Sequence, residues 1–174
     1  MEELLALASE CAELLVHRGW TLGLAESCTG GLVGHIITAL SGSSAYFMGG
    51  IVSYADRIKR DVLGVPDGLI RGCGAVSEPV ARAMAYGVRE KLGVDVALSV
   101  TGIAGPTGGT PGKPVGTVFV GIAAPNGSAV RHFCWDDDRA GNKRRSALAA
   151  LQLLRDALRG ELGPSYRLGP TNER

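Results

Sequence analysis

The sequence predicts an α/β fold, a three-layer α/β/α sandwich with a mixed β-sheet. Segments with helical periodicity alternate with short apolar segments, and this order is typical of a sheet with helices on both faces. Two apolar segments, 115–124 and 128–135, are joined by Pro125-Asn126-Gly127, which predicts a hairpin within the sheet. The 26 glycines and the aromatic content of 5% suit tight turns between strands and helices.

Apolar spacing and turn residues set the expected elements. Helices are expected over 2–18, 31–40, 55–63, 77–92 and 139–159, and strands over 20–26, 50–54, 94–100, 115–124 and 128–135. Gly19 and Gly64 end two of the helices, and Ser77 is expected to cap a helix that has Pro79 in its first turn. We expect one domain over residues 1–160, followed by a flexible tail over 161–174.

Charge and composition exclude several classes of function. The 18 basic and 17 acidic residues nearly balance, which argues against a nucleic-acid partner and against an anionic membrane. No apolar run reaches the roughly 18 to 20 residues that span a bilayer. The acidic start Met-Glu-Glu does not resemble a secretion signal, so we expect a cytoplasmic protein whose four cysteines are free thiols. Without a His-Glu-x-x-His motif or Cys/His pairs at ligand spacing, a zinc site is not expected.

Two glycine-rich loops are candidate ligand sites. The turn Ser27-Cys28-Thr29-Gly30-Gly31 lies between a strand and a helix, where backbone N–H groups can bind an anion, although a plain capped turn explains it equally well. The loop 101–114 is long and rich in glycine, which favours a binding loop over a simple crossover. Its candidate ligand-binding residues are Thr101, Gly102, Gly105, Gly108, Gly109 and Lys113.

The second loop does not match the known nucleotide motifs. The spacing from Gly108 to Gly112-Lys113 is one residue short of a Walker loop, and Pro114 takes the place of the magnesium-binding hydroxyl. The G-x-G-x-x-G dinucleotide pattern is also absent. An ATPase and a Rossmann dehydrogenase are therefore not expected, and a backbone cradle for a small anionic ligand remains.

Hydroxyl and basic side chains offer two further candidates. A serine nucleophile needs a base, and a lysine with a lowered pKa can serve, so Ser43 or Ser44 with Tyr54 and Lys59 is one hypothesis. Spacing alone does not favour it, because most lysines are solvated surface charges. The second candidate is Arg139 with the basic run 143–145, which either binds a phosphate or forms a solvated charged face.

The segments together resemble the CinA C-terminal domain family, which includes nicotinamide mononucleotide deamidases, and the match covers about residues 5–158 in unbroken order. The motifs that carry the resemblance are Ala25-Glu26-Ser27-Cys28-Thr29-Gly30-Gly31, Gly42-Ser43-Ser44, Gly50 to Tyr54 with Lys59, Gly74-Ala75-Val76-Ser77-Glu78, Ser99 to Gly109, and Lys113-Pro114-Val115-Gly116-Thr117. The chain resembles the stand-alone form of the family rather than the larger relatives with an N-terminal domain.

The resemblance implies hydrolysis of nicotinamide mononucleotide to nicotinate mononucleotide and ammonia, with no metal and no cofactor. By position it implies Ser44 as nucleophile, assisted by Tyr54 and Lys59, while the loops 27–31 and 102–109 hold phosphate and ribose. The expected partner is a small pyridine nucleotide, and apolar surface on the first or last helix would serve a homodimer or higher homo-oligomer.

The sequence departs from the family at three places, and these concern substrate binding. Ala55-Asp56 follows Tyr54 where Ser-Asn is common, Asp137 precedes Asp138-Arg139 where glycine is common, and Lys143 replaces an arginine. An alternative is a non-catalytic nucleotide-binding regulatory module related to competence and damage-inducible proteins. The joint presence of Ser44, Tyr54 and Lys59 favours the enzyme over a binder.

Overall fold

A computed structural model describes residues 1–163 and 166–167 and contains a six-stranded sheet in the order β2-β1-β3-β4-β5-β6. The strands are β1 (Leu22–Glu26), β2 (Phe47–Val52), β3 (Val96–Gly102), β4 (Thr117–Ala124), β5 (Gly127–Cys134) and β6 (Tyr166–Arg167). Strands β2, β1 and β3 are parallel, β4 pairs antiparallel with β3 and β5, and β6 is parallel to β5. The expected mixed sheet and its hairpin are confirmed.

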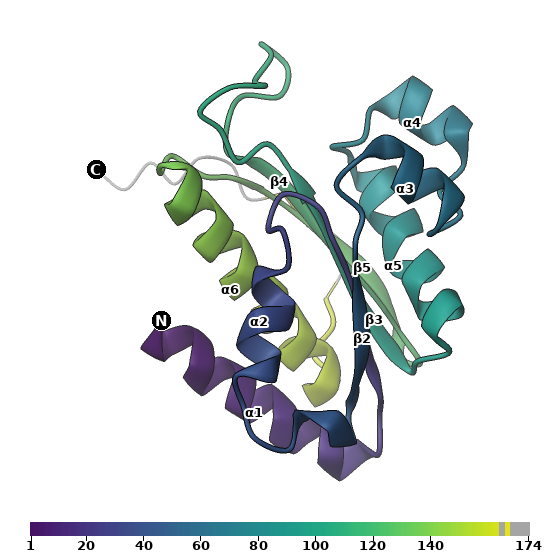
Figure 1. Ribbon diagram of the computed structural model, residues 1–174, viewed down its shortest axis with the longest axis vertical. Helices are drawn as coiled ribbons and strands as arrows, with labels where there is room; N and C mark the ends of the chain where they lie inside the picture. The colour runs from purple at the N-terminus through teal and green to yellow at the C-terminus, as the bar shows by residue number, and fades with distance from the viewer. Residues whose placement is uncertain (164–165, 168–174) are drawn as a thin grey trace.

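Helices cover both faces of the sheet and make three layers. Figure 1 shows α1, α2 and α6 on one face and α3, α4 and α5 on the other. Their bounds are α1 (Glu2–Arg18), α2 (Leu32–Thr38), α3 (Asp56–Asp61), α4 (Asp67–Cys73), α5 (Glu78–Leu92) and α6 (Arg139–Arg159), with a short 3₁₀ turn, η1, at Ser43–Ala45. The predicted α/β/α sandwich is therefore confirmed.

Residues of β1 alternate between the two layers, as the two-residue period of a strand requires. Leu22 and Leu24 pack into the larger core with α1, α2 and α6, whereas Ala25 joins the smaller core beneath α5. All five residues of β1 are buried, which is typical of a central parallel strand. Glu26 shares a face with Leu24, so its carboxylate is directed to the α2 layer.

The connections from β1 and β2 place two chain segments at one edge of the sheet. After β1 the chain passes through α2 and enters β2, which lies beside β1. After β2 it passes through α5 and enters β3, which lies on the opposite side of β1. This reversal of direction leaves a crevice at the carboxyl ends of the parallel strands, where ligands bind in open α/β sheets.

Most expected elements lie where the sequence pattern puts them, with three corrections. The helix Asp67–Cys73 was not predicted, because its seven residues include two glycines and bury none of their side chains. Strand β2 covers 47–52 rather than 50–54. Ser77 is the N-cap residue of α5, but its hydroxyl donates to the carbonyl of Gly74 instead of capping the helix.

The structure describes only part of the segment that follows α6. Helix α6 ends at Arg159 with Gly160 in the left-handed conformation, as the sequence predicts. The expected flexible tail over 161–174 falls largely on residues 164–165 and 168–174, which lie outside the described residues. Within it, Tyr166–Arg167 form β6 and pair with β5, a strand that was not predicted. Among the helices of the described part of the chain, none combines the length and apolar character that crossing a membrane requires.

Helix α5 passes close to the end of α3, and we predict that this contact depends on Gly87. A Cβ atom at Gly87 would overlap the backbone carbonyl of Leu63. Gly87→Ala should therefore lower the free energy of unfolding by roughly 1 to 3 kcal/mol, as measured by urea denaturation. The matched control is Gly72→Ala in α4, where a Cβ would meet nothing, so alanine should leave stability unchanged or raise it by up to about 1 kcal/mol. Equal effects of the two substitutions would contradict the prediction.

Candidate active site

Ser27 and Ser53 lie side by side where two parallel strands end. Ser27 directly follows β1 and extends its pairing with β3, because its N–H donates to the carbonyl of Val100 at 2.9 Å. Ser53 directly follows β2, and its N–H donates to the carbonyl of Glu26 at 2.7 Å. The segment that continues from Ser53 into α3 is thus held against the segment that continues from β1 into α2.

Lys59 of α3 reaches back into this edge and is almost completely buried, with 1% of its surface exposed. Its Nζ donates to the carbonyl of Ser53 at 2.8 Å and to the carbonyl of Tyr54 at 3.4 Å, and it lies 3.2 Å from the hydroxyl oxygen of Ser27. A neutral amine has two N–H groups and one lone pair. In that form the two carbonyls would engage the N–H groups and the lone pair would face the Ser27 hydroxyl, whereas the charged ammonium would donate to all three oxygens.

Burial lowers the pKa of Lys59 from its ordinary value, because desolvation disfavours the charged ammonium. Asp56 opposes this effect, since its carboxylate lies 3.7 Å from Nζ and stabilises the ammonium. Asp56 is largely exposed, so water screens its charge and burial prevails. A lysine with a lowered pKa beside a serine hydroxyl has the chemistry of a general base.

A cavity of about 350 Å³ opens above the Ser27–Lys59 pair, within the usual size range of small-ligand sites. Five segments that are distant in sequence form its walls. They contribute Ser27 and Cys28, then Tyr54, Asp56 and Lys59, then Ala75 and Val76, then Thr101, Gly102, Ile103, Ala104, Gly105, Thr107 and Gly108, and finally Arg139. The crevice expected from the strand order is therefore present and contains the buried lysine.

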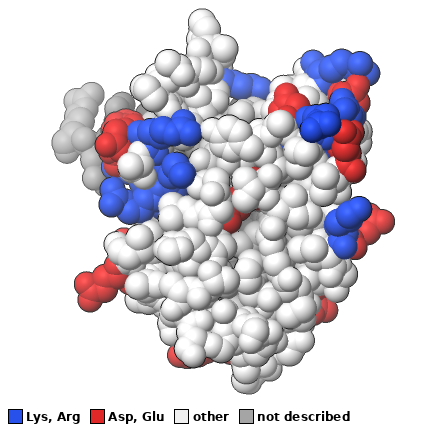
Figure 2. Space-filling view, in the orientation of Figure 1, with Lys and Arg blue, Asp and Glu red and all other residues white. Residues whose placement is uncertain are grey.

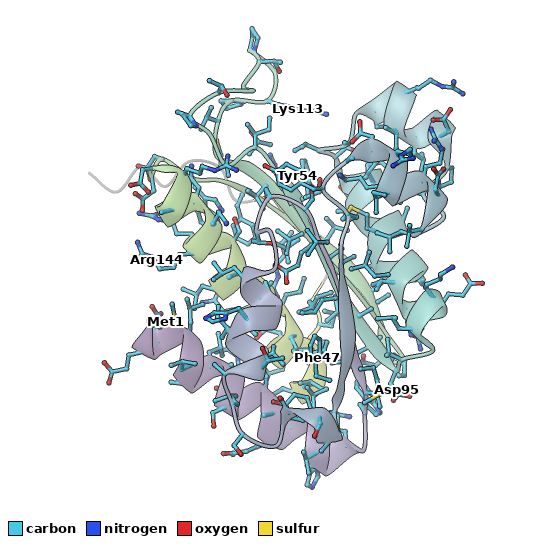
Figure 3. The ribbon with its side chains drawn as sticks, viewed as in Figure 1. Met1, Phe47, Tyr54, Asp95, Lys113 and Arg144 are labelled. Carbon is cyan, nitrogen blue, oxygen red and sulfur yellow. The ribbon has the colours of Figure 1, made fainter. Side chains whose placement is uncertain are left out.

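Arg139, the first residue of α6, closes one side of the cavity. Its guanidinium donates to the carbonyl of Gly105 at 2.7 Å and to the phenol oxygen of Tyr54 at 3.0 Å. Both acceptors are neutral, so these bonds hold the guanidinium in place while its positive charge stays available to a ligand. Tyr54 is 58% exposed, and Figure 3 shows it at the upper edge of the sheet.

Cys28 also borders the cavity, next to Ser27. Burial raises the pKa of its thiol to about 12, so the thiol stays protonated at neutral pH. The thiolate is the nucleophilic form of cysteine. Ser27, rather than Cys28, is therefore the candidate nucleophile of this site.

The prediction that Ser44 stands beside Tyr54 and Lys59 is wrong. Ser44 is an exposed residue of the 3₁₀ turn that precedes β2, whereas Tyr54 and Lys59 follow β2. Figure 3 shows the two ends of this strand, with Phe47 near the lower end and Tyr54 at the upper one. Ser44 does not line the cavity, and the structure brings Ser27 to Lys59 in its place.

The turn 27–31 is not the open anion cradle that the sequence suggested. The Glu26 carboxylate accepts hydrogen bonds from the N–H groups of Gly31, Val33 and Gly34 and so fills the start of α2. Thr29 is fully buried, and neither Gly30 nor Gly31 lines the cavity. The structure therefore does not bring Gly30 and Gly31 to the cavity, and the N–H groups at the start of α2 that were expected to bind a phosphate are occupied by Glu26.

Two N–H groups of the same turn remain available. Within residues 1–163, the backbone N–H groups of Cys28 and Thr29 donate no hydrogen bond to another residue. Both directly follow Ser27. Free backbone N–H groups next to a nucleophile are the usual donors to a developing oxyanion.

The long loop contributes only part of its predicted set to the site. Thr101, Gly102, Gly105 and Gly108 line the cavity, although the Thr101 hydroxyl is already bound to the carbonyl of Ala75 at 2.9 Å. Gly109 lies outside the cavity, because it packs against the backbone of Val115.

Lys113 was expected to supply a positive charge to the ligand. Its ammonium instead donates to the carbonyl of Cys73 at the end of α4, at 2.6 Å, and Lys113 does not line the cavity. Figure 3 shows Lys113 in the projecting loop, with its side chain extending toward the α4 side. This hydrogen bond ties the loop to α4, so the structure does not bring Lys113 to the cavity where the sequence analysis expected it.

The sequence analysis left two interpretations open for the charged residues at the start of α6, a phosphate site or a solvated charged face. The structure supports each interpretation for a different residue. Figure 2 shows Lys, Arg, Asp and Glu side chains gathered over this part of the surface. Arg145 pairs with Asp136 and Asp137 and belongs to a solvated charged face. Lys143 lies beside the turn, since a Cβ placed on Gly30 would be 3.6 Å from its Nζ. Arg139 alone reaches the cavity.

Comparison with known proteins identifies the family of this chain. Residues 4–158 match the family model of the CinA C-terminal domain. The chain belongs to the CinA C-terminal domain family. A CinA-like protein from Geotalea daltonii is 54% identical over 147 residues, which are 84% of this chain and 36% of that protein. A putative competence-damage inducible protein from Symbiobacterium thermophilum is 48% identical over 90% of this chain and 39% of its own. The chain thus spans little more than a third of these relatives.

Solved structures of the same family share the whole fold. The competence/damage inducible protein from Agrobacterium tumefaciens is 36% identical, with a TM-score of 0.87 over 90% of this chain and 96% of its own. A CinA-superfamily protein from Klebsiella pneumoniae is 31% identical, with a TM-score of 0.86 over 90% of this chain and 98% of its own. Relatedness to competence and damage-inducible proteins is therefore established, as the sequence indicated.

Sequence reasoning assigned a role to neither Glu26 nor Asp56, although both shape the site. In the sequence analysis Glu26 appeared only as a member of the motif at residues 25–31. Asp56 appeared only as a residue that differs from the usual family sequence. The position of Glu26 could have been interpreted from the sequence. A carboxylate at the end of a buried strand needs hydrogen-bond donors, and the N–H groups at the start of the following helix supply them. The contact of Asp56 with Lys59 follows from their spacing of three residues on one helix.

We predict that Asp56→Asn lowers the pKa of Lys59 further. The substitution removes the negative charge that stabilises the ammonium and leaves the burial that destabilises it. An NMR titration of the lysine side chains would measure the change. Asp67→Asn is the matched control, because Asp67 pairs with Arg60 and Arg71 and not with Lys59. An unchanged or raised pKa of Lys59 in Asp56→Asn would contradict the assignment.

Proposed function

We propose that the chain is an amidohydrolase in which Ser27 is the nucleophile and Lys59 its general base. The observation that carries the proposal is the buried Lys59 amine 3.2 Å from the Ser27 hydroxyl, with both groups lining one cavity. A Ser–Lys pair performs acyl transfer without a histidine. The base that the resemblance assigned to Lys59 is kept, and the nucleophile moves from Ser44 to Ser27.

The proposed reaction runs through an acyl-enzyme. Lys59 Nζ accepts the hydroxyl proton as Ser27 Oγ forms a bond to the amide carbon, and the oxyanion is stabilised by the free N–H groups of Cys28 and Thr29. The lysine then returns the proton to the departing nitrogen as the C–N bond breaks, which releases ammonia. Water, deprotonated by the same amine, next attacks the ester carbon, the bond from this carbon to Ser27 Oγ breaks, and Lys59 returns the proton to Oγ. The carboxylic acid product then ionises in solvent, and both side chains are restored.

The proposed substrate is nicotinamide mononucleotide, which would yield nicotinate mononucleotide. The family resemblance supports this choice, and so does the charge at the mouth of the cavity. With the start of α2 filled by Glu26, Arg139 is the cationic side chain that lines the cavity opposite Lys59. In the proposed pose the amide faces Ser27, and the phosphate lies toward Arg139.

The decisive test is ammonia release from nicotinamide mononucleotide. Ser27→Ala should lose turnover, and Lys59→Met should lower kcat by roughly a hundredfold to ten-thousandfold, the usual contribution of a general base. Ser44→Ala is the matched control and should retain wild-type kcat, because it replaces a serine at the other end of β2.

Loss of activity in Ser44→Ala with retention in Ser27→Ala would overturn the assignment of the nucleophile. A folded wild-type protein that releases no ammonia over a wide pH range would overturn the proposed activity. Thermal stabilisation by the nucleotide that persists in Ser27→Ala, in a chain without turnover, would instead identify a binding module.

We also predict that Arg139 acts on binding of the phosphate. Arg139→Gln should raise KM for nicotinamide mononucleotide by roughly tenfold to a hundredfold, since a hydrogen bond to a charged group contributes about 1.5 to 3 kcal/mol. It should have little effect on hydrolysis of nicotinamide riboside, which lacks the phosphate. Steady-state kinetics with both substrates measure the difference, and an equal loss with both would show that Arg139 does not recognise phosphate.

A further inference from the structure

Glu26 is a buried carboxylate with no obvious place in the proposed chemistry. Its residue is 3% exposed and directly precedes Ser27. Its carboxylate oxygens accept hydrogen bonds from the N–H groups of Gly31 at 3.0 Å, Val33 at 3.1 Å and Gly34 at 2.8 Å. Burying a charge is unfavourable unless it is well hydrogen-bonded, so this carboxylate and the helix start stabilise each other.

These contacts fix the conformation of the turn that carries Ser27. The N-cap residue of α2 is Gly31, which has no side chain to cap the helix and a φ of 94°. Glu26 supplies the cap from the strand instead and so ties the end of β1 to the start of α2. The intervening turn is closed further by a hydrogen bond of 3.0 Å from the N–H of Gly30 to the carbonyl of Ser27.

One consequence concerns which N–H groups a ligand can use. Those of Gly31, Val33 and Gly34 are occupied by the carboxylate, whereas those of Cys28 and Thr29 are not.

We propose that Glu26 is a positioning residue for amide hydrolysis, which holds the turn that carries Ser27. This inference rests on the proposed function. Glu26 touches neither the Lys59 amine nor the reacting atoms, and it acts through the backbone of the turn. Its loss should therefore lower kcat more than it changes KM, because a misplacement of about 1 Å costs around a hundredfold in rate.

The test is chemical rescue of Glu26→Ala. The substitution vacates a space lined by three N–H groups that acetate can fill, since acetate reproduces the deleted part of the side chain. We expect kcat to fall by about a hundredfold and to be restored in part, and with saturation, by sodium acetate but not by sodium chloride at equal ionic strength. Acetate should also raise the Tm of the variant and leave that of the wild type unchanged.

Asp95→Ala is the matched control, because Asp95 is a second carboxylate that binds a backbone N–H next to β1. It accepts the N–H and the hydroxyl of Thr21 at the amino end of the strand, both at 2.8 Å. Figure 3 shows Asp95 at the lower edge, far from Tyr54. Asp95→Ala should lower Tm and leave kcat and its response to acetate unchanged.

The outcomes separate the two proposals. Glu26→Ala with wild-type kcat, or with a loss that acetate does not restore, would overturn the positioning role while the amidase activity of the wild type stands. If Glu26→Ala does not fold, Glu26→Gln decides, because glutamine keeps the size and removes the charge. A fall in kcat at unchanged KM then supports the role, and an unchanged kcat overturns it.

Discussion

The candidate site depends on the burial of one amine. Lys59 reaches from α3 under the chain that leaves β2, and the carbonyls of Ser53 and Tyr54 hold its Nζ. A charged amine in this position would lose most of its hydration, which explains why its pKa falls. The carbonyls can satisfy the N–H groups of the neutral form, so the folded protein tolerates the neutral amine that the proposed reaction requires. The path of the chain from β2 into α3 is therefore part of the proposed chemistry.

The parallel pairing of β1 and β2 brings a partner to this amine. Because the two strands run in the same direction, the residues that follow them meet at one edge, and this brings Ser27 to Lys59. Residues that precede β2 lie at the opposite edge, which is why Ser44 cannot join them. This distinction was open to sequence reasoning, since a serine before a strand and a lysine after it are separated by the length of the strand.

The parts of the fold that follow from local pattern were predictable, and those that follow from single long-range contacts were not. The long helices α1, α5 and α6 show apolar periodicity and glycine ends, and their limits agree with the sequence within about one residue. Helix α4 has no such signal. The ammonium of Lys113 and the carboxylate of Glu26 each satisfy backbone groups of another segment, and no spacing along the chain reveals which segment will be near.

The position of Glu26 changes the interpretation of Gly30 and Gly31, the glycines of the turn that follows Ser27. The sequence pattern suggested that they make room for a phosphate. The structure gives them a conformational role, because Gly30 and Gly31 both have positive φ and let the chain enter α2 directly above the carboxylate. An anion site is present at this helix, and the anion that occupies it belongs to the protein.

The opposite edge of the sheet offers a practical use. The turn 41–45 is exposed over most of its length and is separated from the cavity by the whole of β2. Exposed turns of this kind tolerate insertions and attached groups better than buried segments do. A fluorophore or an affinity handle introduced there would report on binding or immobilise the protein, and the crevice where Ser27 and Lys59 meet would remain open to substrate.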